Sequence, residues 1–305
     1  MAISNSTDEP QNATIQSVAS KVPPEAPPGI QQVSVRKRHG AVVSDLVAVE
    51  APLEIQVDQR PLVVTMRTPG HDKELAVGFL FAEGIVTGSS QIASVSVQPE
   101  STAAVRSELA IGRVGQGDRV LVALQKAPEM AVVDRAQREF RATAACGVCG
   151  KERLEDLDQP LPSLSPVNCS SELLESLPEI MRPHQILFEA TGGIHAAGLF
   201  TLTGELLCVR EDIGRHNAVD KVIGRAVIQG ATSLKDHILV VSGRAGFELV
   251  QKALKAAIPV MVSVGAASSL AVDMAAAAGM TLYSFVGTGR GNLHIANTST
   301  QTAEH

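Results

Sequence analysis

The chain has no tryptophan, one tyrosine and only 3% aromatic residues among its 305. A core of this size must therefore be built from alanine, valine, leucine and isoleucine, which favours layered helices and strands over an aromatic-rich β-sandwich. The chain also lacks a basic surplus, since its formal net charge is -6. A general nucleic-acid-binding protein would carry excess positive charge. We therefore expect an α/β protein with no nucleic-acid partner.

An uninterrupted hydrophobic run of membrane-spanning length is also missing. The most apolar stretch, residues 256–280, is broken by Pro259, Gly265 and Asp273, so a strand, a turn and an alanine-rich helix explain it better. Residues 1–30 have no positively charged start followed by an apolar run. They predict a disordered leader rather than a secretory signal. We expect no membrane partner and a cytoplasmic location, where paired cysteines bind metal or do chemistry rather than form structural disulfides.

The pattern of short apolar runs divides the chain into five segments. They are a leader (1–30), a β-rich N-terminal domain (31–142), a cysteine loop and linker (143–168), an α/β domain (169–297) and a flexible tail (298–305). In the N-terminal domain the pattern predicts a helix over 72–82 with Asp72 as N-cap, and a helical segment over 128–142. The predicted strands there cover residues 42–49, 53–57, 62–66, 93–97, 105–111 and 120–124.

The second half alternates strands and helices. A strand is expected at 186–189, followed by a hairpin at 198–202 and 206–209. The helices predicted after it cover 217–228, 247–257 and 270–278, and the strands cover 238–241, 260–264 and 281–286. Such alternation is typical of a parallel sheet, whose ligands lie beyond the carboxyl ends of the strands.

Cysteine is scarce, and two of the four cysteines lie close together. Cys146 and Cys149 are flanked by glycines that free the backbone, and Lys151 favours the thiolate. Cys169 and Cys208 have no such spacing, so zinc would need distant or symmetry-related ligands. A zinc site, a redox dithiol and a sulfur-carrying or otherwise nucleophilic thiolate all remain open.

A zinc-dependent deaminase is disfavoured. That chemistry uses His-x-Glu followed by Pro-Cys-x-x-Cys. Here no glutamate stands two residues after His195, Ala145 replaces the proline, and the cysteine pair precedes the histidine.

Four glycine-rich polar clusters in the second half carry the remaining chemistry. Their glycines let backbone N–H groups approach a ligand, and their arginines offer paired donors for phosphate. One cluster alone is more often a plain turn or a surface ion pair. Together they predict a large phosphate-bearing ligand such as a nucleotide. The candidate residues are Thr191, Gly192, Gly193 and His195; Asp212, Arg215, His216, Asn217 and Lys221; Ser242, Gly243 and Arg244; and Gly287, Thr288, Gly289 and Arg290.

The whole set of motifs resembles the formate dehydrogenase accessory sulfurtransferases, the FdhD family, over about residues 33–297. The resemblance is carried by residues 67–70, 74–76, 78–80, 146–151, 191–195, 211–221 and 242–244. It implies a cytidine-deaminase-like layered α/β domain with a smaller β-rich N-terminal domain, in a cytoplasmic homodimer.

The resemblance also implies a sulfur carrier required for formate dehydrogenase activity. Sulfur would pass from a cysteine desulfurase to the molybdenum or tungsten bis-molybdopterin guanine dinucleotide of formate dehydrogenase. That cofactor would be bound transiently as substrate, with no permanent metal. Cys146 corresponds to the persulfide-bearing cysteine of the family, and Cys149 is its companion.

The family's cofactor-binding segment maps onto Phe285, Val286, Gly287, Thr288, Gly289 and Arg290. Gly287 and Thr288 depart from the expected Phe-x-Arg-Gly-x-Arg pattern, whereas Phe285 and Arg290 retain it.

The mechanism that we expect is thiolate attack of the kind that governs disulfide exchange. Cys146 would accept sulfane sulfur as a persulfide, and Cys149 would assist transfer or release the sulfur by closing a disulfide. The alternative is a nucleotide-cofactor chaperone whose cysteine pair is a structural zinc site or a redox dithiol.

Overall fold

The computed structural model of the chain describes residues 28–99, 117–128, 162–165 and 167–294. Cys146 and Cys149 lie outside the described residues. So do the strand predicted at 105–111, almost all of the helix predicted at 128–142, most of the leader and all of the tail.

The N-terminal half contains a two-stranded ribbon and a four-stranded sheet. The ribbon pairs β1 (Ile30–Arg36) with β2 (Val42–Ala48) in antiparallel register. The sheet has the order β4-β3-β6-β5, in which β3 and β6 are parallel and the other neighbours antiparallel. Its strands are β3 (Ala51–Val57), β4 (Arg60–Arg67), β5 (Ile92–Gln98) and β6 (Asp118–Leu124), with the short 3-10 helix η1 (Ser89–Gln91) before β5.

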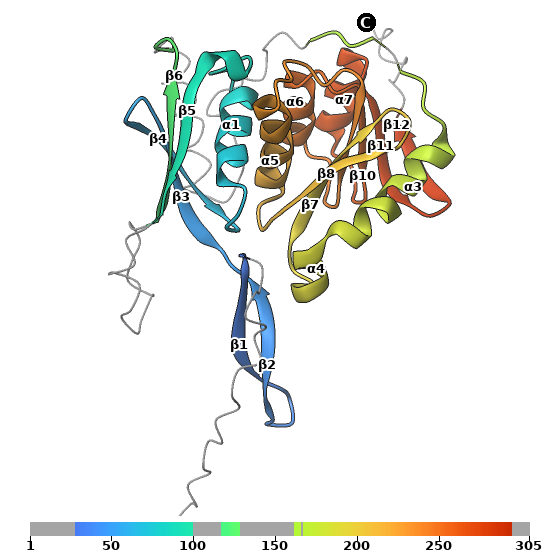
Figure 1. Cartoon of the computed structure of the whole chain (residues 1–305). Helices are drawn as coiled ribbons and strands as arrows, with labels where there is room; N and C mark the ends of the chain where they lie inside the picture. Colours follow the sequence, from blue (N-terminus) through green and yellow to red (C-terminus); the bar gives the residue numbers. More distant parts are fainter. Residues whose placement is uncertain (1–27, 100–116, 129–161, 166, 295–305) are drawn as a thin grey trace, which may run out of the picture.

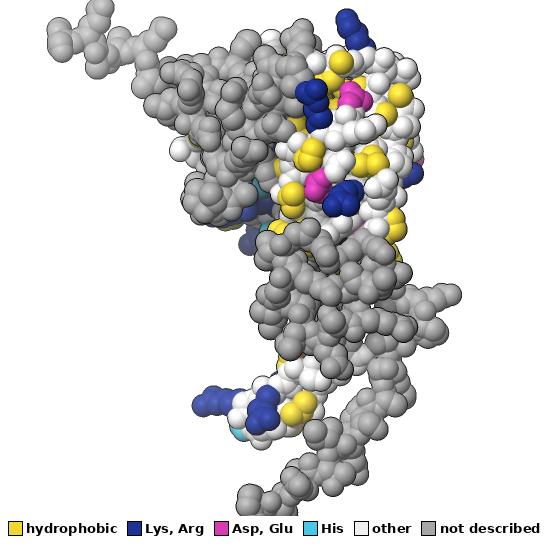
Figure 2. All heavy atoms as spheres, turned by 90° about the vertical axis from the view of Figure 1, so that its left-hand side faces the viewer, with side chains coloured by type: hydrophobic (Ala, Val, Ile, Leu, Met, Phe, Trp, Pro, Cys, Tyr) yellow, Lys and Arg dark blue, Asp and Glu magenta, His cyan; other side chains and the backbone are white. Residues whose placement is uncertain are grey.

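Buried and more exposed side chains alternate along β3, which gives this sheet one buried face. Leu53, Ile55 and Val57 on β3 point inward, and helix α1 (Asp72–Ala82) covers them. The opposite face looks outward in Figure 2, where hydrophobic side chains are interspersed with charged ones.

Helix α1 covers the predicted residues, but its N-cap differs from the prediction. His71 occupies the N-cap with a left-handed φ of 60° and makes no side-chain capping bond. Asp72 is instead the first helical residue, and its carboxylate accepts two 3.0 Å hydrogen bonds from the Arg67 guanidinium. Asp72 and Glu74 still suit the positive end of the helix dipole.

The C-terminal half is built on a six-stranded sheet of order β12-β11-β10-β9-β7-β8. The central strands β9, β10 and β11 are parallel, as predicted, but β7, β8 and β12 run antiparallel to their neighbours. The expectation of a parallel sheet is therefore only partly right, because short turns at Gly204 and Gly289 leave no room for a crossover. The strands are β7 (His195–Thr201), β8 (Leu206–Asp212), β9 (His237–Val241), β10 (Val260–Ser263), β11 (Thr281–Gly287) and β12 (Arg290–His294).

Helices cover both faces of this sheet, which makes a three-layer arrangement (Figure 1). Leu239 and Val241 face one set of helices, whereas Ile238 and Val240 face the other. The first set is α5 (Arg215–Ile228), α6 (Phe247–Lys255) and α7 (Ser269–Ala278), all predicted to within a few residues. The second face is covered by α3 (Ser171–Met181).

Two parts of this half differ from the sequence-based expectation. The predicted strand at 186–189 is wrong: these residues belong to helix α4 (Ile186–Thr191), which follows a 3-10 turn, η4 (Arg182–His184). Glu211 explains the helix, because its carboxylate accepts the N–H groups of Leu187 at 2.9 Å and Phe188 at 2.8 Å at the helix start. Helix α3 and strand β12 were not expected.

The two halves meet where α1 crosses α5. A Cβ atom added to Gly78 would lie 1.8 Å from the Asp220 carbonyl oxygen, and one added to Gly224 would lie 1.8 Å from that of Glu74. The helices therefore touch backbone to backbone, and one hydrophobic cluster includes Leu53 from the first half and Leu239 from the second. Within the described ranges, no helix is long and apolar enough to cross a membrane.

Candidate functional site

The candidate site lies at the sheet edge where β9 and β10 end and β7 begins. Ser242 and Gly243 follow β9, Gly265 follows β10, and His195 opens β7. Helices α5, α6 and α7 also begin here, so their N-termini bring partial positive charge to this edge. This is the position that the sequence predicted for the polar clusters.

Two strand-end loops are held together through glycines. The Gly265 N–H donates to the Gly243 carbonyl at 3.0 Å, and the Ser263 hydroxyl donates to the same oxygen at 2.7 Å. A Cβ on Gly265 would lie 2.8 Å from the Arg244 nitrogen, so only glycine fits. Ser242 supports the edge from the next strand, because its hydroxyl accepts the Ala196 N–H at 2.9 Å.

His195 and Arg215 pack around Gly243. A Cβ at Gly243 would lie 3.2 Å from His195 Nδ1 and 3.8 Å from Arg215 Cδ. Burial lowers the pKa of His195, and the positive charges of Arg215 and His216 lower it further. His195 is therefore neutral at pH 7 and can donate or accept a hydrogen bond, while Arg215 supplies charge. His216 turns to α6 instead, with its Nε2 2.7 Å from Glu248 Oε2.

The Phe285–Arg290 segment forms a hairpin beside this edge. The Phe285 N–H donates to the Gly265 carbonyl at 3.1 Å, while its side chain is 53% exposed at a left-handed φ of 54°. A bulge between Ser284 and Gly287 causes this, and Thr288 and Gly289 then turn the chain into β12. Arg290 is exposed, and its Nε would lie 3.0 Å from a Cβ on Gly287. An exposed ring and a guanidinium thus flank the edge.

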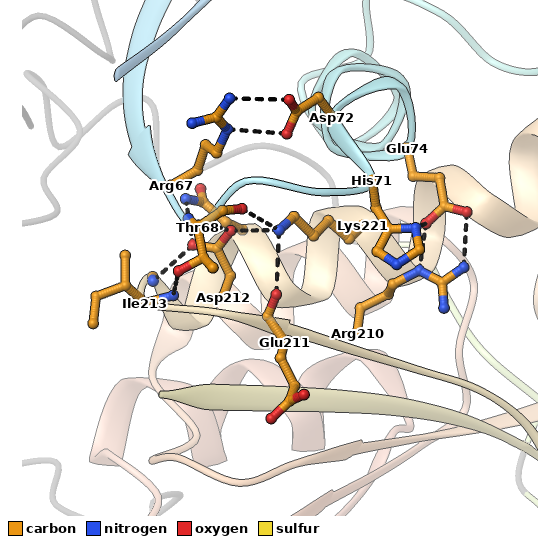
Figure 3. Close-up of polar contacts among 12 residues, drawn as sticks. Arg67, Thr68, His71, Asp72, Glu74, Arg210, Glu211, Asp212, Ile213 and Lys221 are labelled. Atoms are coloured by element: carbon orange, nitrogen blue, oxygen red, sulfur yellow. Dashed lines mark hydrogen bonds and ion pairs between the residues drawn. The ribbon is translucent and has the colours of Figure 1, made fainter. Parts of the chain in front are cut away.

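Three of the predicted site residues are enclosed in the protein. Asp212 accepts hydrogen bonds from Thr68 N (3.1 Å), Gly214 N (2.9 Å) and Asn217 Nδ2 (3.0 Å), and it pairs with Lys221 Nζ at 2.7 Å (Figure 3). Lys221 Nζ also donates to the carbonyls of Thr68 and Glu211, at 2.9 and 3.2 Å. These polar groups are used within the chain, where they fix the loop that enters α5.

The Thr191–Gly193 cluster ends a helix rather than a strand. Thr191 Oγ1 donates to the Leu187 carbonyl at 2.7 Å, and Gly192 closes α4 in the left-handed conformation. Gly192 and Gly193 are exposed and lead directly to His195. Their expected position after a strand is wrong, because residues 186–191 are helical.

A row of buried and partly buried ion pairs was missed by the sequence analysis, although Arg67 and Glu74 belong to the quoted motifs. Arg67, fully buried, binds Asp118 as well as Asp72. Figure 3 shows the Arg67–Asp72 pair and the two contacts between Glu74 and Arg210. These pairs join β4 and α1 to β6 and β8. The signal in the sequence is an arginine that ends a strand five residues before Asp72, at the start of the next helix.

The two described cysteines are poor nucleophiles. Burial raises the pKa of the Cys208 thiol, and it raises that of Cys169 as well. A higher pKa leaves less thiolate at neutral pH. Among the residues that the structure describes, no group of three or more His, Cys, Asp and Glu side chains is arranged to hold a metal ion.

Comparison with known proteins places these features in a family. A model described as the FdhD/NarQ family matches residues 48–299. The sulfur carrier protein FdhD of Corynebacterium efficiens is 47% identical over 254 residues, which is 81% of this chain and 87% of the relative. The corresponding protein of Streptomyces avermitilis is 42% identical over 259 residues, 83% of this chain and 88% of the relative.

A solved structure shares the fold. It is a crystal structure described as a formate dehydrogenase accessory protein from Desulfotalea psychrophila, with a TM-score of 0.65 and 24% identity. The match covers 88% of this chain and 97% of the other.

Proposed function

The chain belongs to the FdhD/NarQ family, and from that premise we propose that it is a sulfur carrier that serves a formate dehydrogenase. The relatives named sulfur carrier protein FdhD match four-fifths of the chain at more than 40% identity. The cytoplasmic location and the homodimer implied by the resemblance belong to the same proposal.

The first step of the proposed reaction loads sulfur onto Cys146. Its thiolate attacks the outer sulfur of a persulfide on a cysteine desulfurase. A new S–S bond forms on Cys146, the S–S bond of the donor breaks, and the donor cysteine leaves as a thiolate. The two described cysteines do not compete well for this role, because burial raises the pKa of each.

The second step releases the sulfur to the acceptor. The Cys149 thiolate attacks the inner sulfur of the Cys146 persulfide, so that a Cys146–Cys149 disulfide forms and hydrosulfide leaves. The hydrosulfide passes to the molybdenum or tungsten bis-molybdopterin guanine dinucleotide, which is the substrate. A dithiol reductant then returns the disulfide to two thiols.

The proposal that a dinucleotide cofactor accepts the sulfur is supported by the chemistry of the sheet edge. Three helix N-termini and the guanidinium of Arg215 suit the phosphates of a dinucleotide. Glycines at 243 and 265 let the two strand-end loops and His195 pack closely at this edge, and the exposed Phe285 ring offers a face for a planar base.

The test is mass spectrometry of protein incubated with cysteine desulfurase and L-cysteine. The wild-type protein and the Cys149→Ala variant should gain one sulfur atom, whereas Cys146→Ala should gain none. Cys169→Ala is the matched control and should behave like the wild type. Absence of added sulfur on Cys146 in the wild type would rule out the carrier. Zinc that is lost on replacing both Cys146 and Cys149 would favour the chaperone alternative.

A further inference from the structure

The β1–β2 ribbon stands away from the rest of the molecule (Figure 1). Its base is fixed by the Val49 N–H, which donates to the Gly29 carbonyl at 2.8 Å, and by packing against α4. Neither strand pairs with any other strand in the part of the chain that the structure describes, so within that part both outer edges of the ribbon are open. A two-stranded ribbon is at best marginally stable alone in water.

Aliphatic side chains are exposed on both faces of β2. The register pairs Val43 with Val35, so valines from both strands share one face. Val43 and Val47 on that face are 38% and 39% exposed. Val42 and Leu46 on the other face are 62% and 38% exposed. No described part of the chain covers these side chains fully.

The tip of the ribbon is basic. Arg36, Lys37 and Arg38 follow one another and are exposed, with His39 beside them, and Asp45 is the one acidic residue of the two strands. Figure 2 shows Lys and Arg side chains gathered at the far end of the ribbon, next to hydrophobic ones. The whole chain has a formal net charge of -6, so a cluster of positive side chains at the ribbon tip contrasts with the charge of the rest of the molecule.

The ribbon lies at the same end of the molecule as the candidate site. Helix α4 packs against β1 and β2, and the chain runs from its last residue, Thr191, through two glycines to His195 at the site edge. A protein bound to the ribbon would therefore also face that edge.

We propose that the ribbon is a docking arm for the client, formate dehydrogenase, and that it enters an apolar groove with an acidic rim near the client's cofactor entrance. The inference rests on the proposed function for the identity of the partner. Exposed valines and open strand edges suit a protein groove, which supplies both apolar contacts and backbone hydrogen bonds. The basic tip suits an acidic rim, which also speeds association.

Other partners fit the ribbon less well. An open strand edge would leave backbone groups unsatisfied inside a bilayer, and a phosphate backbone offers nothing to the valines. A second copy packed face to face covers too little area. Seven residues span about 23 Å, so a face about 10 Å wide gives roughly 230 Å² per partner, against about 800 Å² in a stable interface.

The experiment measures binding of the full chain to immobilised, purified formate dehydrogenase from the same organism. Two variants test the arm: Lys37→Glu with Arg38→Glu at the tip, and Val43→Thr with Val47→Thr on one face. The control reverses two exposed charges elsewhere, Lys126→Glu with Lys235→Glu. Each arm variant should lower the affinity at least about tenfold, and the control should stay within about twofold.

Both arm variants alter exposed side chains, so all proteins should keep the melting temperature of the wild type and gain sulfur on Cys146. If the wild type fails to bind, or if all variants bind alike, the docking arm is ruled out. It is also ruled out if the tip variant binds formate dehydrogenase normally but loses sulfur uptake, because the arm would then serve the donor.

Two further measurements identify other occupants. Sedimentation showing a dimer that dissociates only in the arm variants would assign the arm to a second copy. Arm-dependent binding to vesicles of phosphatidylglycerol and phosphatidylcholine, or to single-stranded RNA, would assign it to a membrane or a nucleic acid. Arm-dependent binding to formate dehydrogenase without any sulfur on Cys146 would retain the docking arm and reject the carrier.

Discussion

Positive charge and hydrogen bonding come from different side chains at the sheet edge. Arg215 and Arg244 carry permanent charge there, whereas the lowered pKa of His195 leaves that ring neutral at pH 7. In the proposed site the arginines would therefore attract an anion at any physiological pH, and the histidine would select a hydrogen-bonding group on it.

Replacing one of these arginines should weaken nucleotide binding. We expect Arg215→Gln to raise the dissociation constant for guanosine diphosphate at least about tenfold, because a charge-assisted hydrogen bond is lost beside a helix N-terminus. Isothermal titration calorimetry measures this. Arg119→Gln, on the distant β6 strand, is the control and should bind like the wild type. Equal dissociation constants for both variants would remove Arg215 from the binding site.

Stability should depend on pH through His195. Its pKa is lowered in the folded protein, so below about pH 6.5 the unfolded chain binds more protons at this site. Its contribution to stability is complete above that pH and is lost as the pH falls through the folded pKa. We expect His195→Gln to flatten the fall in unfolding free energy between about pH 7 and pH 5, measured by urea denaturation.

The control for this effect is His39→Gln, which alters an exposed histidine at the ribbon tip. It should retain the wild-type pH dependence. An unchanged slope in His195→Gln would mean that His195 does not titrate differently in the folded and unfolded chains.

Sequence reasoning predicted which candidate residues lie close together better than it predicted the contacts that each one makes. The expected cluster of His195, Arg215 and Gly243 does form, because strand ends and helix starts meet at one edge of such a sheet. Asp212 and Lys221 were grouped with them as ligand-binding residues, yet they bond to each other and to Thr68. Spacing along the chain cannot reveal that a residue from a distant strand, Thr68, takes up these polar groups.

At the scale of elements, the hydrophobic periodicity predicted most helices and the central strands. It failed at residues 186–189, where a short apolar run has no period long enough to separate a strand from a helix. The deciding contact comes from Glu211, more than twenty residues later, whose carboxylate binds the helix N–H groups. Helix α3 was missed because Pro178 interrupts its pattern, although Ser170 is an N-cap that bonds the Leu173 N–H.

The α1–α5 crossing should not tolerate a single methyl group. Gly224→Ala would gain helix propensity, worth about 1 kcal/mol, but its Cβ would lie 1.8 Å from the Glu74 carbonyl oxygen. Since backbone cannot rotate away, we expect a net loss in the unfolding free energy near the upper end of about 1–3 kcal/mol. Urea denaturation followed by circular dichroism measures it.

The matched control is Gly193→Ala, where the nearest atom would be 3.8 Å from the new Cβ. It should change stability by less than about 1 kcal/mol. A Gly224→Ala protein as stable as the wild type would show that the two helices can separate without cost.

At the scale of the whole molecule, the buried ion pairs make the two halves interdependent. Lys221 bonds Asp212 from its own half and the Thr68 carbonyl from the other. Lys221→Met would leave the buried Asp212 carboxylate without its cation, at a cost of about 3–5 kcal/mol.

We expect the loss of stability in Lys221→Met to appear equally in both halves of the molecule. Hydrogen exchange measured by mass spectrometry should show β3 and β9 losing protection by the same factor in Lys221→Met, because both strands open with the shared core. Lys235→Met, at an exposed position, should leave protection unchanged. Loss of protection in β9 alone would mean that the halves unfold separately.

The bulge at Phe285 also gives the protein a natural place for an optical reporter. The backbone there already holds a large aromatic side chain at a left-handed φ, with the ring turned to solvent beside the sheet edge. Because the chain has no tryptophan, Phe285→Trp would introduce its sole indole. Excited at wavelengths that spare tyrosine, that single fluorophore would test the proposed binding of a guanine nucleotide, because a base stacked on the indole would quench its emission in real time and without any label.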